Sequence, residues 1–166
     1  GQDSSVMVTW VQNAAGQILG DPTAPDQFRY AIWNGSSWVE GVVTPADVSA
    51  LLSYDTALFQ ADQGVLVFSR DTNNDFTSRD DAELFYSQWD GVAWSALTPL
   101  TQNAMLDESP SVNYSSTGGK SLLWLQGNQL VMLGDDWTAG LVSTQMESEG
   151  YELHSFESAM DNQNNI

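Results

Sequence analysis

GVLVFSRDTNNDFTSRDDAELFYSQWDGVAW, residues 64–94, contains two apolar runs joined by a loop and followed by a turn. An apolar run from Val65 to Phe68 leads into an acidic loop, and a second run from Leu84 to Tyr86 leads to Asp90-Gly91 and Trp94. Short runs rich in Val, Leu, Phe and Tyr and bounded by Gly, Asn and Asp are typical of β-strands. The segment therefore predicts a strand, a loop, a second strand and a tight turn.

Weaker copies of this unit lie on both sides of it. Each copy ends in Gly-x-x-Trp, at Gly35 to Trp38, Gly91 to Trp94 and Gly134 to Trp137, and each Gly-x-x-Trp follows two apolar runs. Trp38 and Trp94 are 56 residues apart. Self-similarity at a fixed period indicates a repeat architecture. The chain is predicted to be a single repeat domain over 1–166, with approximate repeats at 1–60, 61–116 and 117–166.

Several of the apolar runs barely alternate between apolar and polar residues, notably VMVTWV at 6–11 and LLWL at 122–125. A strand that is apolar on both faces must be covered on both faces. Small sheets that stack face to face, as the blades of a β-propeller do, meet this condition. The predicted fold class is all-β, with about three four-stranded antiparallel repeats that form propeller blades in a larger or multi-chain propeller.

Two of the turns carry a hairpin signal. Asn34-Gly35 and Asp90-Gly91 stand between apolar runs and predict two-residue type I′ turns, in which both central residues have positive φ. After each of these turns, the linking segment is predicted to hold the last strand of one blade, a crossover that contains Pro, and the first strand of the next blade.

Three blades are too few for an ordinary propeller, which has four to eight. Two explanations stay open. The chain is an excerpt of a longer propeller, or copies associate so that residues 151–156 of one complete the blade begun by residues 6–11 of another. Head-to-tail contacts of this kind close into rings or grow as filaments. A β-sandwich that is not a propeller is the remaining alternative.

The central unit resembles secreted bacterial β-propeller repeats whose turns are related to the sialidase Asp-box. ELFYSQWDGVAWSALTPLT at 83–101 and DESPSV at 107–112 carry the resemblance, which spans nearly the whole chain. Against the approximate pattern Ser-x-Asp-x-Gly-x-Thr-Trp, Ser87, Gly91 and Trp94 are in register, Asp90 stands one position late, and Ala93 replaces Thr. In that family the box is a structural turn away from any active site, so the resemblance implies a fold and no chemistry.

The composition excludes several partner classes. Twenty-two acidic residues against four basic ones give a formal net charge of −18, and such a surface repels nucleic acid and anionic membranes. The absence of cysteine excludes thiol catalysis. No apolar stretch approaches the roughly 20 residues that cross a bilayer, so membrane insertion is not expected. The acidity suits a saline or calcium-rich exterior, and an extracellular or cell-surface location is expected.

The acidic loop is the sharpest candidate site. Oxygen donors at alternate positions of a tight loop suit Ca²⁺, which takes six to eight oxygen ligands. Phe76 and Ala82 replace the Gly and Glu of an EF-hand, whereas the resemblance to integrin-type propeller loops implies a calcium site between strands. The competing interpretation is a solvated loop that forms Asx-turns. The predicted calcium ligands are Asp71, Asn73, Asp75, Asp80, Asp81 and Glu83.

An enzymatic function is not expected, and a fragment of a glycoside hydrolase is the enzymatic alternative. Paired carboxylates such as Asp107-Glu108 are adjacent on a strand and point to opposite faces, whereas a glycosidase needs two carboxyls that flank one bond. His154, the single histidine, follows no serine in a nucleophile elbow. Recurrent tryptophans could stack on sugars, but their equivalent positions favour core packing: Trp10, Trp33, Trp89 and Trp124.

The sequence thus predicts an extracellular, calcium-stabilised binding or adhesion module with a protein or glycan ligand. The alternative is a structural subunit that assembles head to tail, as a homo-oligomeric ring or an extracellular fibre, through complementary terminal strands.

Overall fold

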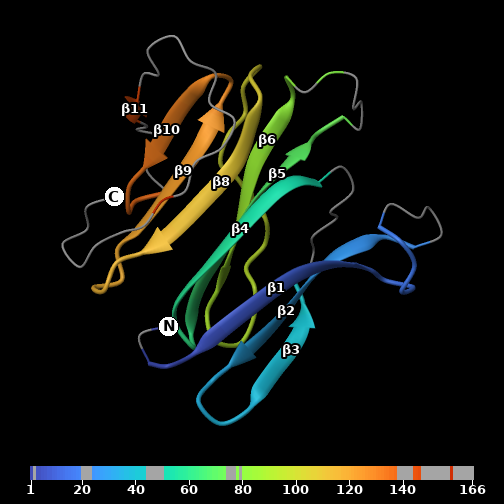
Figure 1. Cartoon of the computed structure of the whole chain (residues 1–166), viewed down its shortest axis with the longest axis vertical. Coiled ribbons are helices and arrows are strands. Elements are labelled where there is room, and N and C mark those ends of the chain that lie inside the picture. The colour runs from blue at the N-terminus through green and yellow to red at the C-terminus, as the bar shows by residue number, and fades with distance from the viewer. Residues whose placement is uncertain are drawn as a thin grey trace.

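The computed structural model describes residues 1, 3–19, 24–43, 51–73, 78, 80–137 and 158, and the backbone of residues 144–146. These residues form eleven β-strands and no helix (Figure 1). The strands build three antiparallel sheets, so the predicted all-β class is confirmed. Across the described ranges, no helix is long and apolar enough to span a membrane.

Each sheet is a meander in which strands that follow one another in sequence pair side by side. The first sheet has the order β1-β2-β3, the second β4-β5-β6-β7, and the third β11-β10-β9-β8. The segments that link them end one sheet and begin the next, as predicted. The strands are β1 (Val6–Asn13), β2 (Asp26–Trp33), β3 (Trp38–Val42), β4 (Leu51–Gln60), β5 (Gln63–Asp71), β6 (Ala82–Trp89), β7 (Thr98–Pro99), β8 (Asp107–Tyr114), β9 (Lys120–Gln126), β10 (Gln129–Leu133) and β11 (Thr144–Met146).

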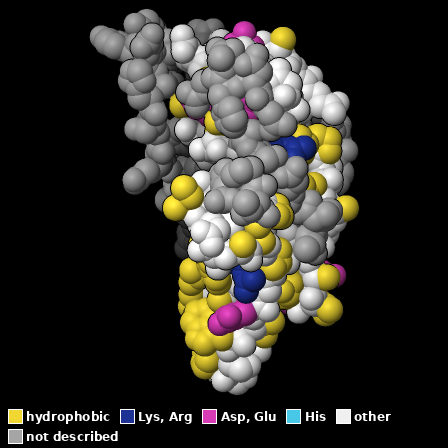
Figure 2. Space-filling view, turned by 90° about the vertical axis from the view of Figure 1, so that its right-hand side faces the viewer, with side chains coloured by type: hydrophobic (Ala, Val, Ile, Leu, Met, Phe, Trp, Pro, Cys, Tyr) yellow, Lys and Arg dark blue, Asp and Glu magenta, His cyan; other side chains and the backbone are white. Residues whose placement is uncertain are grey.

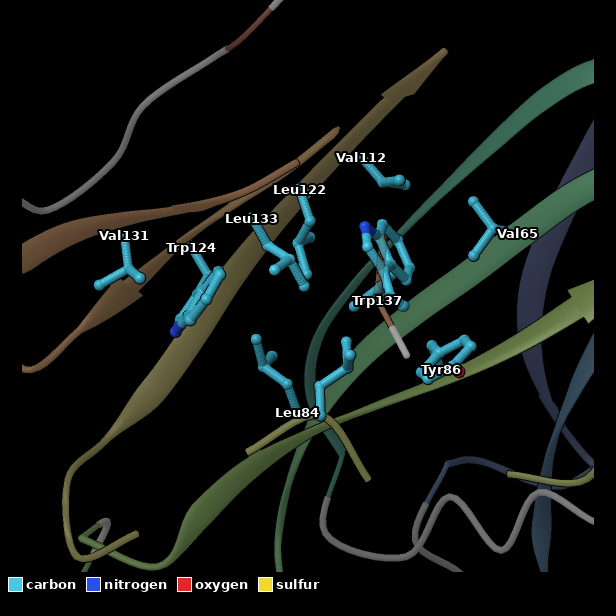
Figure 3. Close-up of a cluster of buried hydrophobic side chains, with 11 residues drawn as sticks. Val65, Leu84, Tyr86, Val112, Leu122, Trp124, Val131, Leu133 and Trp137 are labelled. Atoms are coloured by element: carbon cyan, nitrogen blue, oxygen red, sulfur yellow. The ribbon is translucent and has the colours of Figure 1, made fainter. Parts of the chain in front are cut away.

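The second sheet is covered on both faces, and its strand β5 shows this best. Val65 and Val67 belong to the core shared with the third sheet, and Leu66 and Phe68 belong to the core shared with the first sheet. All four side chains are fully buried. Figure 3 shows side chains of the second sheet facing those of the third across the first of these cores. The apolar run 65–68 is thus covered on both faces. The run 122–125, for which this was predicted, is buried at all four positions.

The same expectation is wrong for β1. Met7 and Val11 pack against the core between the first and second sheets, but Val6 and Val8 alternate with them and are each 48% exposed. The reason is that no described element lies on the far side of the first sheet. A run that reads as apolar on both faces has only one of them covered.

The turns at Asn34 and Asp90 are not the predicted type I′ hairpins. Each is a four-residue loop, because Trp33 is opposite Trp38 and Trp89 is opposite Trp94. Within these two loops only the glycines have positive φ, +94° at Gly35 and +92° at Gly91. The glycine positions were therefore predicted correctly, and the turn type was not.

The side chain before each glycine stabilises the longer loop. Oδ1 of Asp90 accepts hydrogen bonds from the backbone N–H groups of Val92 and Ala93, at 2.9 and 2.8 Å. Oδ1 of Asn34 accepts the equivalent bonds from Ser36 and Ser37, at 3.1 and 3.0 Å. Two loop N–H groups are satisfied without a second left-handed residue, which explains why a carboxylate and a carboxamide serve equally at this position.

The third Gly-x-x-Trp step is built differently. Gly134 does not have the positive φ of Gly35 and Gly91. In the sequence, Gly134 directly follows the last residue of β10, Leu133, with no Asn or Asp between them. Asp135 instead accepts a hydrogen bond from the backbone N–H of Lys120, at 3.0 Å. The common Gly-x-x-Trp pattern therefore hides two different turns.

Candidate functional site: the open face of the first sheet

The first sheet presents an uncovered face with three tryptophans. Strand register places Val6 opposite Trp33, Val8 opposite Ala31 and Trp10 opposite Arg29, and Trp33 in turn opposite Trp38. Because paired residues share a face of a sheet, these side chains project to the same side, away from the second sheet. The term open face is used below for this set: Val6, Val8, Trp10, Arg29, Ala31, Trp33, Trp38, Glu40 and Val42.

The open face is apolar and accessible. Trp38 is 50% exposed, about as much as Val6 and Val8, and its ring lies 5.8 Å from that of Trp33. In Figure 2 hydrophobic side chains gather at the lower end of the molecule, where β1, β2 and β3 lie. Burying one half-exposed side chain of this size would contribute on the order of 1 kcal/mol. Several such side chains on one face make a surface suited to a partner.

The exposure of Trp38 contrasts with its counterparts in the other two turns. Trp94 and Trp137 are only 9% and 7% exposed. Each packs edge to face against a tyrosine of the preceding sheet, Trp94 on Tyr30 and Trp137 on Tyr86. Trp38 holds the same place in its own turn, but no described sheet precedes the first one. The open face of the first sheet therefore corresponds to the face with which the second and third sheets each pack against the sheet before them.

Among the described residues, the first sheet also has a free edge. The second and third sheets begin with β4 and β8, which pair with β5 and β9, whereas β1 pairs with no described strand other than β2. The carbonyl of Phe28 accepts a hydrogen bond from the backbone N–H of Val43, so the backbone groups of Phe28 point toward β3. Val11 is opposite Phe28 on β1, and its backbone groups therefore point away from β2. By alternation, the N–H and C=O groups of Met7, Thr9 and Val11 face this edge, and the Thr9 carbonyl accepts a bond from the Tyr54 hydroxyl at 3.5 Å. The remaining groups are a template for another strand.

The predicted calcium ligands are not gathered into one site by the described residues. Oδ1 of Asp71 accepts the backbone N–H of Asn73 at 3.0 Å, as in an Asx-turn. Asp75 lies outside the described residues. In the ranges that the structure describes, no group of three or more acidic or histidine side chains is placed to hold a metal ion. Calcium binding stays a prediction.

Glu83, another predicted ligand, belongs to a buried network instead. Its Oε1 accepts the backbone N–H of Asn103 at 2.6 Å, and the side chain of Asn103 donates to Asp107 at 2.7 Å. Asp107 is fully buried and also accepts bonds from Trp124 Nε1, at 2.8 Å, and Gln126 Nε2, at 3.0 Å. Burial raises the pKa of Glu83, and the nearby Asp107 charge adds to this effect. The network joins the second and third sheets and has a structural role.

The structure separates the recurrent tryptophans that the sequence treated as one class. Trp89 and Trp124 are buried, as predicted. Trp10 and Trp33 are only partly buried and belong to the open face. Trp38 was not predicted as a site residue. His154 and residues 151–156 lie outside the described residues.

Comparison with protein-family models, with curated proteins and with solved structures finds no match for this chain.

Proposed function

We propose that this chain is an assembly module, a stack of propeller-type β-sheets that docks another copy of itself on the open face of the first sheet. The observation that carries the proposal is the half-exposed Trp38. Its two counterparts are buried against a preceding sheet. The open face therefore has the side chains of an interface between two sheets, but no described sheet packs on it. A ring or an extracellular fibre is the form that such assembly takes.

Two further features of the first sheet support docking of a β-sheet rather than of a small molecule. Its face is broad and apolar, with valines beside the indole rings, which suits the close packing of two sheets about 10 Å apart. Its edge along β1 presents the backbone groups of Met7, Thr9 and Val11. A partner sheet can therefore be recognised by both side chains and backbone.

The solution mass tests the proposal. Sedimentation equilibrium of the unmodified protein should give a mass above the 18.1 kDa of one chain, rising with concentration. Val8→Lys places a charge on the open face and should weaken association about tenfold or more. Val92→Lys is the matched control, because Val92 is 85% exposed and lies in the turn of the second sheet. A monomeric wild-type protein, or equal effects of the two substitutions, would contradict the proposal.

Glycan binding is a second candidate function for the same face. Three indoles on one sheet face resemble a platform on which sugar rings stack, and Trp10 Nε1 donates to the side-chain amide oxygen of Gln12 at 3.3 Å. Amide groups beside indole rings are suited to neutral sugar hydroxyls, and a chain of net charge −18 would not attract acidic sugars.

The two candidates predict different titrations. If glycans are the ligand, neutral oligosaccharides should quench tryptophan fluorescence of a monomeric protein, and Trp38→Ala should abolish the signal. If the open face docks a second copy, the same sugars should leave both the fluorescence and the solution mass unchanged.

A further inference from the structure

We propose that residues 153–160 of one copy act as the missing first strand of the first sheet of another copy, by pairing antiparallel with the free edge of β1. This inference rests on the assembly function proposed above and identifies the segment that performs it. Two independent observations, a contact and a sequence match, point to this segment, and the register follows from the match.

The first observation is the position of Ser158. Its hydroxyl bonds to Ser111 Oγ at 2.8 Å and accepts from Asn113 Nδ2 at 2.7 Å, so it lies against strand β8. Both partners project from the third sheet on the side away from the second, because the residues that alternate with them, such as Val112, face the second sheet. Ser158 therefore lies on the outer face of the third sheet.

Strand β8 is itself held on the second sheet in a corresponding way. The backbone N–H groups of Ser109 and Val112 donate to Ser53 and Asp55 of β4, at 2.9 and 2.8 Å. With the 56-residue spacing between repeats, Asp55 corresponds to Ser111. Asp55 contacts the first strand of the next sheet, and Ser111 contacts Ser158. Ser158 thus occupies the place of a first strand of a fourth sheet.

The second observation is a sequence match with β4. Residues 51–58 read LLSYDTAL, and residues 153–160 read LHSFESAM. Three positions are identical, and four pair similar side chains: Tyr54 with Phe156, Asp55 with Glu157, Thr56 with Ser158 and Leu58 with Met160. Since 51–58 is a first strand in the structure, the matching segment has the side chains for the same role.

The register of the proposed pairing follows from this match. In the second sheet, Thr56 of β4 pairs with Leu66 of β5. Strand β1 corresponds to β5. Val6 of β1 is opposite Trp33, as Gly64 of β5 is opposite Trp89, so Val8 corresponds to Leu66. Ser158 should therefore lie opposite Val8.

The faces agree with this register. Thr56 projects toward the first sheet, where it bonds to Thr9, so Ser158 should project toward the sheet that precedes its own. That sheet is the third sheet of the same copy, and there Ser158 bonds to Ser111 and Asn113. In this proposed register, sequence positions 156 and 160 stand opposite Trp10 and Val6 of the open face.

One contact between copies then satisfies both incomplete features of the first sheet. Pairing with residues 153–160 fills the edge of β1, and it brings the open face onto the outer face of the donor copy's third sheet. The second sheet lies between the first and third sheets of one copy, so the pairing joins different copies. The expected assembly joins two or more copies head to tail.

Disulfide trapping tests the register, because the chain contains no cysteine of its own. Val8→Cys and Ser158→Cys are made as separate proteins, mixed, and oxidised. Opposed residues on antiparallel strands are within disulfide reach. The mixture should give a cross-linked species of twice 18.1 kDa, and neither protein alone should do so. Val39→Cys mixed with Ser158→Cys is the control, because Val39 is exposed on β3, away from the free edge of β1.

Hydrogen exchange on the unmodified protein gives a second measurement that needs no variant. The amides of Met7, Thr9 and Val11 should become at least tenfold more protected as the protein is concentrated through its association range. Cross-linking with this protection establishes the strand pairing. A dimer without cross-linking above the Val39 control and without protection overturns the pairing and leaves assembly through the open face intact. A protein that stays monomeric at every concentration overturns both.

Discussion

Tyr30 and Trp94 meet edge to face across the first and second sheets, with ring centroids 5.8 Å apart and an interplanar angle of 67°. The contact recurs one sheet further on, where Tyr86 and Trp137 are 5.4 Å apart at 87°. A tyrosine in the middle of one sheet and the tryptophan that ends the turn of the next thus form a repeated inter-sheet contact. Edge-to-face pairs of this kind add about 0.5–1.5 kcal/mol beyond the area they bury.

A double-mutant cycle on Tyr30 and Trp94 should therefore reveal a coupling of about 1 kcal/mol. Tyr30→Leu and Trp94→Leu each remove one ring and keep an apolar side chain, and the free energy of unfolding is measured by urea denaturation. The matched cycle pairs Tyr30→Leu with Trp38→Leu, because Trp38 projects from the opposite face of the first sheet. Equal coupling in the two cycles would show that the Tyr30–Trp94 contact has no specific energetic role.

The sequence predicted the strands and their order, and it failed where similar segments have different surroundings. Residues 122–125 were correctly predicted to be buried on both faces, and all four side chains are. Residues 6–11 carry the same pattern without the same surroundings. Side-chain pattern reports which residues favour burial, whereas the presence of a covering layer depends on other parts of the fold.

The candidate calcium site shows the same limit at the level of single residues. Glu83 was grouped with the acidic loop by its spacing and by the resemblance to integrin-type loops, and the structure adds a partner, Asn103, that lies 20 residues away in the sequence. The turn at Asn34 shows a smaller error of this kind. Its glycine signal was correct, and the hydrogen bonds of the Asn34 side chain, which set the loop length, were not readable from the dipeptide.

Glu83 should make stability depend on pH. Burial raises its pKa above the ordinary value of 4.5, so the native state binds this proton more tightly than the unfolded state. The contribution of Glu83 to stability therefore increases as the pH falls from neutral toward 4.5. Glu83→Gln should stabilise the protein at pH 7 and flatten this part of the profile, measured as urea midpoints from pH 7 to 4.5. Asp80→Asn, at an exposed position, is the control, and parallel profiles for wild type and Glu83→Gln would refute the assignment.

Asp90 should affect stability with the opposite pH dependence. Backbone bonds from Ala93 and Val92 lower the pKa of its carboxyl below the ordinary value of 3.8. The stabilisation by the charged form is therefore present at neutral pH and is lost as the pH falls below about that value. Asp90→Ala should lower the melting temperature at pH 7, whereas Asp90→Asn should retain most of it, because Asn34 makes the same bonds in the first sheet. A loss as large in Asp90→Asn as in Asp90→Ala would mean that the turn bonds are not responsible.

Calcium should raise the melting temperature of chelator-treated protein if the acidic loop binds it, because a ligand that binds only the native state stabilises that state. Asp75→Asn is the informative substitution, since Asp71 is buried and bonded within its own turn, and its replacement would disturb the fold without any metal. The expected result is a saturable rise with calcium in the wild type, a smaller one with magnesium, and none in Asp75→Asn. Asp136→Asn, in the turn of the third sheet, should respond as the wild type does. If calcium still raises the melting temperature of Asp75→Asn, the ion binds outside the loop. If calcium does not raise the melting temperature of the wild type, the loop is a solvated loop of Asx-turns that binds no calcium.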